Sequence, residues 1–150
     1  MKALSLWQPW ATLIAIGAKR VETRSWSTSY RGPVAIHAAK KQDYDSLAMC
    51  LEQPFRSALI AGGIRYPKEM PFGAIVAVVN LDKCAHIVNG WRPRVPHCPH
   101  EVDFGDYTEG RWAWDLHAVR PLKEPVVCSG AQGLWDVGPG IEARVRDQLQ

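Results

Sequence analysis

The sequence lacks several features that would assign it at once to a common class of protein. No stretch approaches the roughly 20 apolar residues of a membrane-spanning helix, and the opening segment MKALSLWQPW has no uninterrupted apolar region of the kind found in secretory signals. The four cysteines lie far apart without a Cys-x-x-Cys pair, as is typical of reduced thiols in the cytoplasm. No repeat or low-complexity linker divides the chain. We therefore expect one cytoplasmic, monomeric domain spanning residues 1–150 that does not contact a membrane.

Motifs that define several enzyme classes are also missing. The chain has no Gly-x-Ser-x-Gly nucleophile motif and no phosphate-binding loop. Long tracts of Lys and Arg, which would suggest a disordered nucleic-acid-binding arm, are absent as well. The formal net charge is only +3, but the cations cluster between residues 19 and 41, where Glu22 is the single acid. This clustering is compatible with a polyanionic partner without requiring one.

The spacing of apolar residues predicts an α+β fold that is mostly β. Helical spacing is found at residues 10–17, 41–61 and 141–149. Pro54 either kinks the second of these regions or splits it into two helices. Strands are predicted at residues 20–26, 33–38, 72–81, 111–120, 124–127 and 133–137. The run at 72–81 is continuously apolar, which indicates a strand buried on both faces, and residues 89–110 form a long segment without a regular period. Valine-rich and tryptophan-rich strands of this kind favour a curled sheet or small barrel with flanking helices.

The densest group of charges follows the first predicted helix. Because side chains alternate along a strand, Glu22, Arg24 and Trp26 lie on one face, and Lys19 lies just before them at the joint between helix and strand. Cationic donors beside a carboxylate acceptor and an aromatic ring suit the edges and flat face of a nucleobase. A structural network of surface ion pairs, each contributing about 0–1 kcal/mol, is an equally ordinary interpretation of the same residues.

Three sequence segments stand out in the first 40 residues. Ser5–Ala11 has the sequence SLWQPWA and is followed by the pattern Gly-x-Lys-x-x-Glu-x-Arg, beginning at Gly17. Arg31–Ala38 then has the sequence RGPVAIHA. Together these segments resemble the ASCH domain family, and the resemblance extends more weakly to the strands near residues 72–77 and 112–114. The resemblance implies a PUA-like fold, a small β-barrel with a helix-lined cleft. It also implies binding of RNA or a modified nucleoside.

The same resemblance suggests an enzymatic alternative. Some small ASCH proteins hydrolyse the amide of N4-acetylcytidine with a lysine, a threonine and a glutamate. Lys19 matches that lysine, and Glu22 occupies the position of the threonine. The chain would then be an amidohydrolase acting on N4-acylated cytosine nucleosides, with Lys19 polarising the base substituent and Glu22 positioning a water. A third alternative is a protein-interaction module without a nucleic-acid ligand.

The predicted binding site consists of one cleft and needs no cofactor or metal. Its floor would hold the charged group, its rim would contact phosphates, and the segment 89–110 would cover one side. The residues assigned to it are Gln8, Lys19, Glu22, Arg24, Trp26, Arg31 and Lys40.

Two further groups of residues leave alternatives open. His37 is either a hydrogen-bonded structural histidine or part of the cleft. Zinc-ligand chemistry occurs at Cys84, His86, His97, Cys98 and His100, but their spacing does not match the usual paired arrangements.

Overall fold

A curled six-stranded sheet forms the centre of the protein, in the strand order β2-β5-β4-β3-β1-β6. The computed structural model describes residues 1–149. The strands are β1 (Lys2–Leu6), β2 (Val21–Arg24), β3 (Gly32–Ala38), β4 (Ala74–His86), β5 (Trp112–Val127) and β6 (Leu134–Asp136). The helices are α1 (Trp10–Ala15), α2 (Tyr44–Met49), α3 (Phe55–Ala61) and α4 (Pro139–Gln148), with a short 3₁₀ helix, η1 (Pro67–Glu69).

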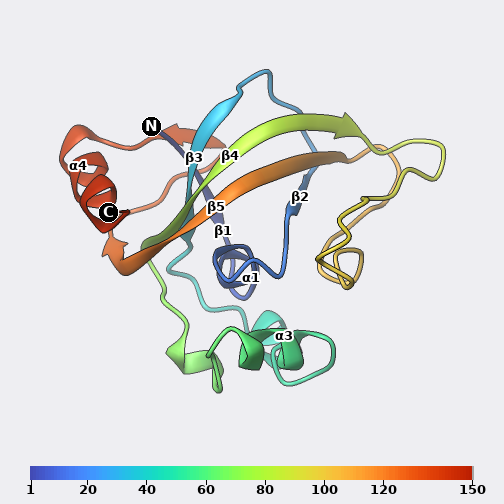
Figure 1. Cartoon of the computed structure of the whole chain (residues 1–150), viewed down its shortest axis with the longest axis horizontal. Coiled ribbons are helices and arrows are strands. Elements are labelled where there is room, and N and C mark those ends of the chain that lie inside the picture. The colour runs from blue at the N-terminus through green and yellow to red at the C-terminus, as the bar shows by residue number, and fades with distance from the viewer. Residues whose placement is uncertain (150) are drawn as a thin grey trace.

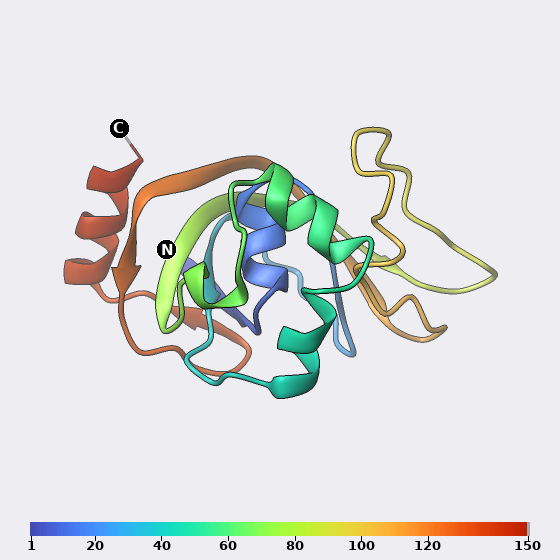
Figure 2. The same cartoon turned by 90° about the horizontal axis from the view of Figure 1, so that it is seen from below.

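The sheet wraps around α1. Figure 1 shows the long strands β4 and β5 arching over this helix. Figure 2, which views the molecule from below, shows the same two strands curving around the helix. β1 and β3 are parallel, whereas the other strand pairs are antiparallel. The structure therefore confirms a mostly β, PUA-like half-barrel with flanking helices.

Alternating apolar residues allow the central strands to bury both faces. Leu4 and Ile36 face α1 and join one apolar core. Their neighbours Ala3 and Ala35 point to the opposite face and join a second core, which α4 covers with Val145. The first eight residues of β4 are buried apart from Asn80. Four of them join the first core and two the second, which confirms the prediction of a strand buried on both faces.

The prediction of two separate strands at 111–120 and 124–127 was wrong. Both stretches belong to the single strand β5, which pairs with β4 along most of its length. The register between the two strands shifts at three places, and Ala118 has a positive φ of 46°. Such bulges bend a strand without ending it, so β5 can follow the curvature around α1.

Residues 41–61 form two helices, so the region is split near Pro54 and not merely kinked. α2 ends at Met49 and α3 begins at Phe55, and both helices pack beneath α1 (Figure 2). Phe55 and Leu59 from α3 form a third apolar cluster with Leu13 of α1 and Phe104 of the long loop. No helix within residues 1–149 has both the length and the apolar character needed to cross a bilayer.

Gly62 provides a test of the packing between α3 and α1. A Cβ at this position would lie 2.6 Å from Cδ1, 2.9 Å from Cγ2 and 3.0 Å from Cβ of Ile16. The Cβ of Ile16 is bonded directly to the backbone and cannot move aside as the flexible end of a side chain would. We therefore expect Gly62→Ala to lower the free energy of unfolding by about 1–3 kcal/mol. Gly140→Ala in α4 is the matched control, since a Cβ there meets nothing within 4 Å. Denaturant unfolding of both variants checks this, and equal stabilities would contradict it.

Candidate functional site

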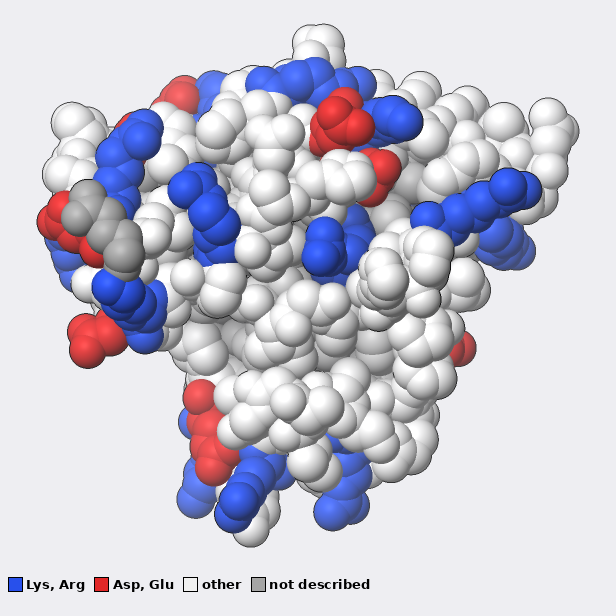
Figure 3. All heavy atoms as spheres, viewed as in Figure 1, with Lys and Arg blue, Asp and Glu red and all other residues white. Residues whose placement is uncertain are grey.

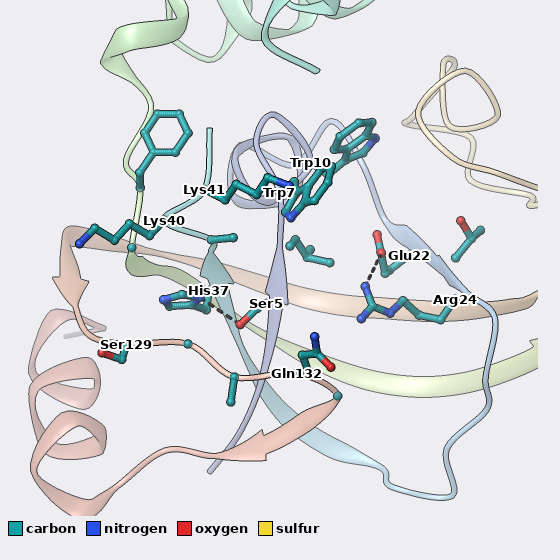
Figure 4. A pocket seen from close by; sticks show the side chains of 18 of the residues that line it. Ser5, Trp7, Trp10, Glu22, Arg24, His37, Lys40, Lys41, Ser129 and Gln132 are labelled. Atoms are coloured by element: carbon teal, nitrogen blue, oxygen red, sulfur yellow. Dashed lines mark hydrogen bonds and ion pairs between the residues drawn. The ribbon is translucent and has the colours of Figure 1, made fainter. Parts of the chain in front are cut away.

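A cleft of about 1210 Å³ opens beside the ends of β1 and β3. Six parts of the chain form its walls: residues 5–10, 22–26, 37–41, 72–73, 104–111 and 127–133. Figure 4 shows Glu22 and Arg24 at one end, Lys40 at the other, and Ser5 and His37 between them. Segments far apart in the sequence thus contribute to a single space.

β2 brings the predicted charged pair to this cleft. Arg24 Nη1 lies 3.6 Å from Glu22 Oε1, and the guanidinium carbon of Arg24 lies 5.6 Å from the ring centroid of Trp26. Because β2 is the edge strand of the sheet, only β5 pairs with it, and its other side is free to border the cleft. Trp26 is held by an edge-to-face contact with Trp114, whose indole N–H also donates to the Trp26 carbonyl oxygen at 3.2 Å.

Burial dominates the electrostatics of Glu22. Removal of its carboxyl group from water raises its pKa above the ordinary value, although the nearby cations Lys19, Arg24 and Arg111 act in the opposite direction. A carboxylate of this kind is a strong acceptor for ligand N–H groups, since little water competes for it.

The raised pKa of Glu22 predicts how stability depends on pH. Between pH 4.5 and the pKa that Glu22 has in the folded protein, the folded protein holds a proton on Glu22 that the unfolded chain releases. This residue's contribution to the free energy of unfolding is therefore lost as the pH rises through the folded pKa. Glu22→Gln removes that titration. We expect the melting temperature of the variant, relative to wild type, to increase from pH 4 to pH 7. Thermal unfolding across this range checks it, and a difference that is constant or decreases with pH would contradict it.

The Lys19 side chain points away from the cleft that Glu22 and Arg24 line. Gly17, with a φ of +79°, reverses the chain after α1, and the N–H groups of Ala18 and Lys19 both donate to the carbonyl oxygen of Leu13. The Lys19 side chain then enters the interior, where it is 1% exposed. Its Nζ donates to the carbonyl oxygen of Val21 and lies 3.5 Å from Glu101 Oε1. Lys19 is not part of the cleft wall.

Glu101 was not identified from the sequence. Its carboxylate accepts the backbone N–H groups of Arg20 at 2.7 Å and Val21 at 3.0 Å, and it also accepts the hydroxyl of Tyr107 at 3.4 Å. These contacts fix the loop 87–111 to the start of β2. No local pattern could have revealed this pairing, because Lys19 and Glu101 are 82 residues apart and Glu101 lies in a segment without periodicity.

The remaining predicted residues divide into two groups. Lys40 lines the cleft, whereas Gln8 and Arg31 do not. The amide of Gln8 is used internally, with Nε2 donating to Pro71 O at 2.8 Å and Oε1 accepting the N–H of Thr12 at 3.0 Å. Arg31 is exposed and donates to the carbonyl oxygens of Thr28 and Tyr30.

The cleft wall carries more positive than negative charge. Four cationic side chains face two carboxylates, those of Glu22 and Asp106; the cations are Arg24, Lys40, Lys41 and Arg111. On the face of the molecule shown in Figure 3, Lys and Arg side chains are spread across the surface rather than gathered in one block. Trp7, which is 43% exposed, adds an aromatic surface beside Lys41, whose Nζ lies 4.7 Å from its ring centroid.

The residues with zinc-ligand chemistry are dispersed. His86 stacks on Trp112 at 4.4 Å, and Cys98 Sγ donates to Gly17 O at 3.4 Å. Within residues 1–149, the three side chains whose ligand atoms lie within 4.8 Å of one another are Asp82, Asp115 and His117. None of these three residues is among the five cysteines and histidines that the sequence offered as possible zinc ligands.

Comparison with known proteins agrees with the fold and shows the family. The family model for the ASCH domain matches residues 4–125. The chain belongs to the ASCH domain family. Two solved structures have the same fold: ASCH from Zymomonas mobilis, with a TM-score of 0.54 and 13% identity over 99% of this chain and 95% of that one, and a mutant form of that protein, with a TM-score of 0.58 and 16% identity over 99% and 98%.

Curated relatives match a shorter part of the chain. Activating signal cointegrator 1 from Homo sapiens is 38% identical over 82 residues, and the protein of that name from Mus musculus matches equally. The match covers 54% of this chain but only 14% of each relative. This ASCH domain therefore corresponds to a small part of those larger proteins.

Proposed function

We propose that the cleft of this ASCH domain binds single-stranded RNA and accepts one nucleobase, which can be a modified one, at the Glu22 end. The observation that carries the proposal is the Glu22–Arg24 pair in the cleft wall beside Trp26. A carboxylate accepts the exocyclic N–H groups of a base, and a neighbouring guanidinium donates to its ring nitrogen or carbonyl oxygen. Trp7 and Trp10 offer ring surfaces on which bases can stack.

The size and charge of the cleft favour an RNA segment over a free nucleoside. Small-molecule pockets typically measure about 300–1,000 Å³, and this cleft, at about 1210 Å³, exceeds that range. Lys40 and Lys41 lie away from Glu22, at the positions where phosphates of an adjoining nucleotide would extend (Figure 4). The same ligand would therefore contact the base-recognising pair and the lysines together.

The geometry gives less support to hydrolysis of N4-acylated cytosine. That mechanism requires Lys19 to reach the substrate, and Lys19 Nζ is instead occupied by Val21 O and Glu101 inside the protein. Glu22 alone would remain at the cleft. Binding is the function that the arrangement of residues favours.

Fluorescence anisotropy with labelled single-stranded RNA tests the proposal. Two phosphate contacts predict that log K falls with log salt concentration with a slope contribution of about −1.4, since each contact contributes about −0.7 on single strands. Lys40→Gln should reduce the steepness of the slope by about 0.7, whereas Lys68→Gln, a control outside the cleft wall, should leave it unchanged. Absence of RNA binding by folded protein at about 50 mM salt, where such contacts are strong, would refute the proposal.

A further inference from the structure

Ser5 and His37 form a hydrogen-bonded pair in the middle of the cleft. They are register partners on the parallel strands β1 and β3, and Ser5 Oγ lies 3.1 Å from His37 Nδ1 (Figure 4). Both residues belong to the cleft wall. The binding function proposed above does not use either of them.

The surrounding contacts determine the direction of each hydrogen bond. His37 Nε2 lies 3.1 Å from the carbonyl oxygen of Cys128, which can only accept, so Nε2 carries the proton. Nδ1 is therefore the acceptor and the Ser5 hydroxyl donates to it. The indole N–H of Trp135 donates to Ser5 Oγ at 3.1 Å and fixes the hydroxyl in this orientation. A hydroxyl, a histidine base and a third group that orients the base constitute the arrangement of a nucleophilic dyad.

His37 is in the protonation state that a base requires. The residue is 2% exposed, and burial lowers its pKa below the ordinary value, while the hydrogen bond to Cys128 O acts in the opposite direction. Its ring is therefore neutral at pH 7 and able to accept a proton.

Gly130 packs directly against the pair. A Cβ at this position would lie 2.7 Å from Ser5 Oγ and 2.5 Å from Cε1 of His37. The φ of Gly130 is outside the left-handed region, so its backbone conformation does not require glycine. What requires glycine is the close approach of its backbone to both side chains, so a substrate reaches the hydroxyl from the open side of the cleft.

We propose that Ser5 and His37 hydrolyse small carboxylic esters bound in the cleft, an activity additional to RNA binding. Ser5 Oγ attacks the acyl carbon as its proton passes to His37 Nδ1. The bond to the alkoxy group breaks, and the alcohol leaves with that proton. Water then attacks the acyl-serine with His37 again as base, releasing the carboxylic acid and restoring the Ser5 hydroxyl.

Labelling with a fluorophosphonate probe tests the pair directly, because the probe phosphonylates activated serines with loss of fluoride. We expect mass spectrometry of wild-type protein to show one phosphonyl group, on the peptide that contains Ser5. Ser5→Ala should abolish labelling, and His37→Asn should slow it at least about 100-fold, within the usual contribution of a general base. Ser27→Ala is the control, since Ser27 is exposed and outside the cleft wall, and it should label like wild type.

Hydrolysis of p-nitrophenyl acetate provides the second measurement. We expect Ser27→Ala to be as active as wild type, His37→Asn to be slower and Ser5→Ala to be inactive. Peptide mapping of wild-type protein locates the label even where a variant fails to fold. Folded wild-type protein without a label on Ser5, or equal labelling of Ser5→Ala and wild type, would overturn the proposal. RNA binding is measured on the same samples. Protein that binds RNA but carries no label on Ser5 overturns the esterase proposal alone and leaves the binding function intact.

Discussion

Glu101→Ala should lower the free energy of unfolding by about 3–5 kcal/mol, more than Gly62→Ala or Lys19→Met. The substitution leaves the Lys19 ammonium, 1% exposed, without its carboxylate and removes the acceptor of two backbone N–H groups, those of Arg20 and Val21. Loss of an acceptor from buried donors carries their full desolvation cost. For a domain of this size we expect the melting temperature to fall by roughly 6–20 °C.

Variants of the same network distinguish two roles for Lys19, which are anchoring the loop 87–111 and contacting a ligand. Lys19→Met retains most of the side chain's volume, and Glu101 keeps its bonds to Arg20 N, Val21 N and Tyr107. We therefore expect a smaller loss of stability than for Glu101→Ala, and the double variant Lys19→Met/Glu101→Gln should be more stable than Glu101→Ala. Unfolding in denaturant compares the variants. RNA affinity of folded Lys19→Met should stay within about threefold of wild type; a loss comparable to that of Arg24→Ala would show that Lys19 contacts the ligand.

Arg24→Ala should have the largest effect on RNA binding. Arg24 is the partly exposed donor of the charged pair, and its side chain is 25% exposed in the cleft wall. A hydrogen bond to a charged group contributes about 1.5–3 kcal/mol, so we expect affinity to fall roughly 10- to 150-fold. Anisotropy at fixed salt measures this directly. Arg56→Ala is the matched control, since it removes an exposed arginine from α3 outside the cleft wall.

Arg24→Ala should act on recognition rather than on folding. Its side chain makes one ion pair and lies over the Trp26 ring, and the buried Glu22 keeps Lys19 and Arg111 as nearby cations when Arg24 is removed. A melting temperature close to wild type is therefore expected together with weak RNA binding. Equal RNA affinities for Arg24→Ala and Arg56→Ala would contradict the role assigned to the charged pair.

Local periodicity predicted the elements that depend on local residues. The face shared by Glu22 and Arg24 follows from alternation along β2, and the division at Pro54 follows from the restrictions of proline. The continuity of β5 could not be predicted in this way. Its bulges depend on how β4 and β5 curve together around α1, which is a property of the assembled sheet.

The position of Lys19 shows why a motif does not define a site. Glu22 and Arg24 are two residues apart on one strand, so their proximity is built into the backbone. Lys19 precedes the strand, after the turn at Gly17, and its direction depends on the carboxylate of Glu101 in a distant loop. The sequence predicted that all three charged groups meet, whereas the structure brings only two of them to the cleft.

The sequence by itself determined the ASCH family, the mostly β fold and the charged pair on β2, because these depend on neighbours a few residues apart. Only the tertiary structure decided that Lys19 and Gln8 bond within the protein and that Ser5 meets His37 beneath Gly130. The hydrogen bonds that fix these positions join residues 32, 63 and 82 positions apart along the chain, and no local pattern encodes them. They arise because the curled sheet closes around α1 and brings the ends of its strands and loops to one place.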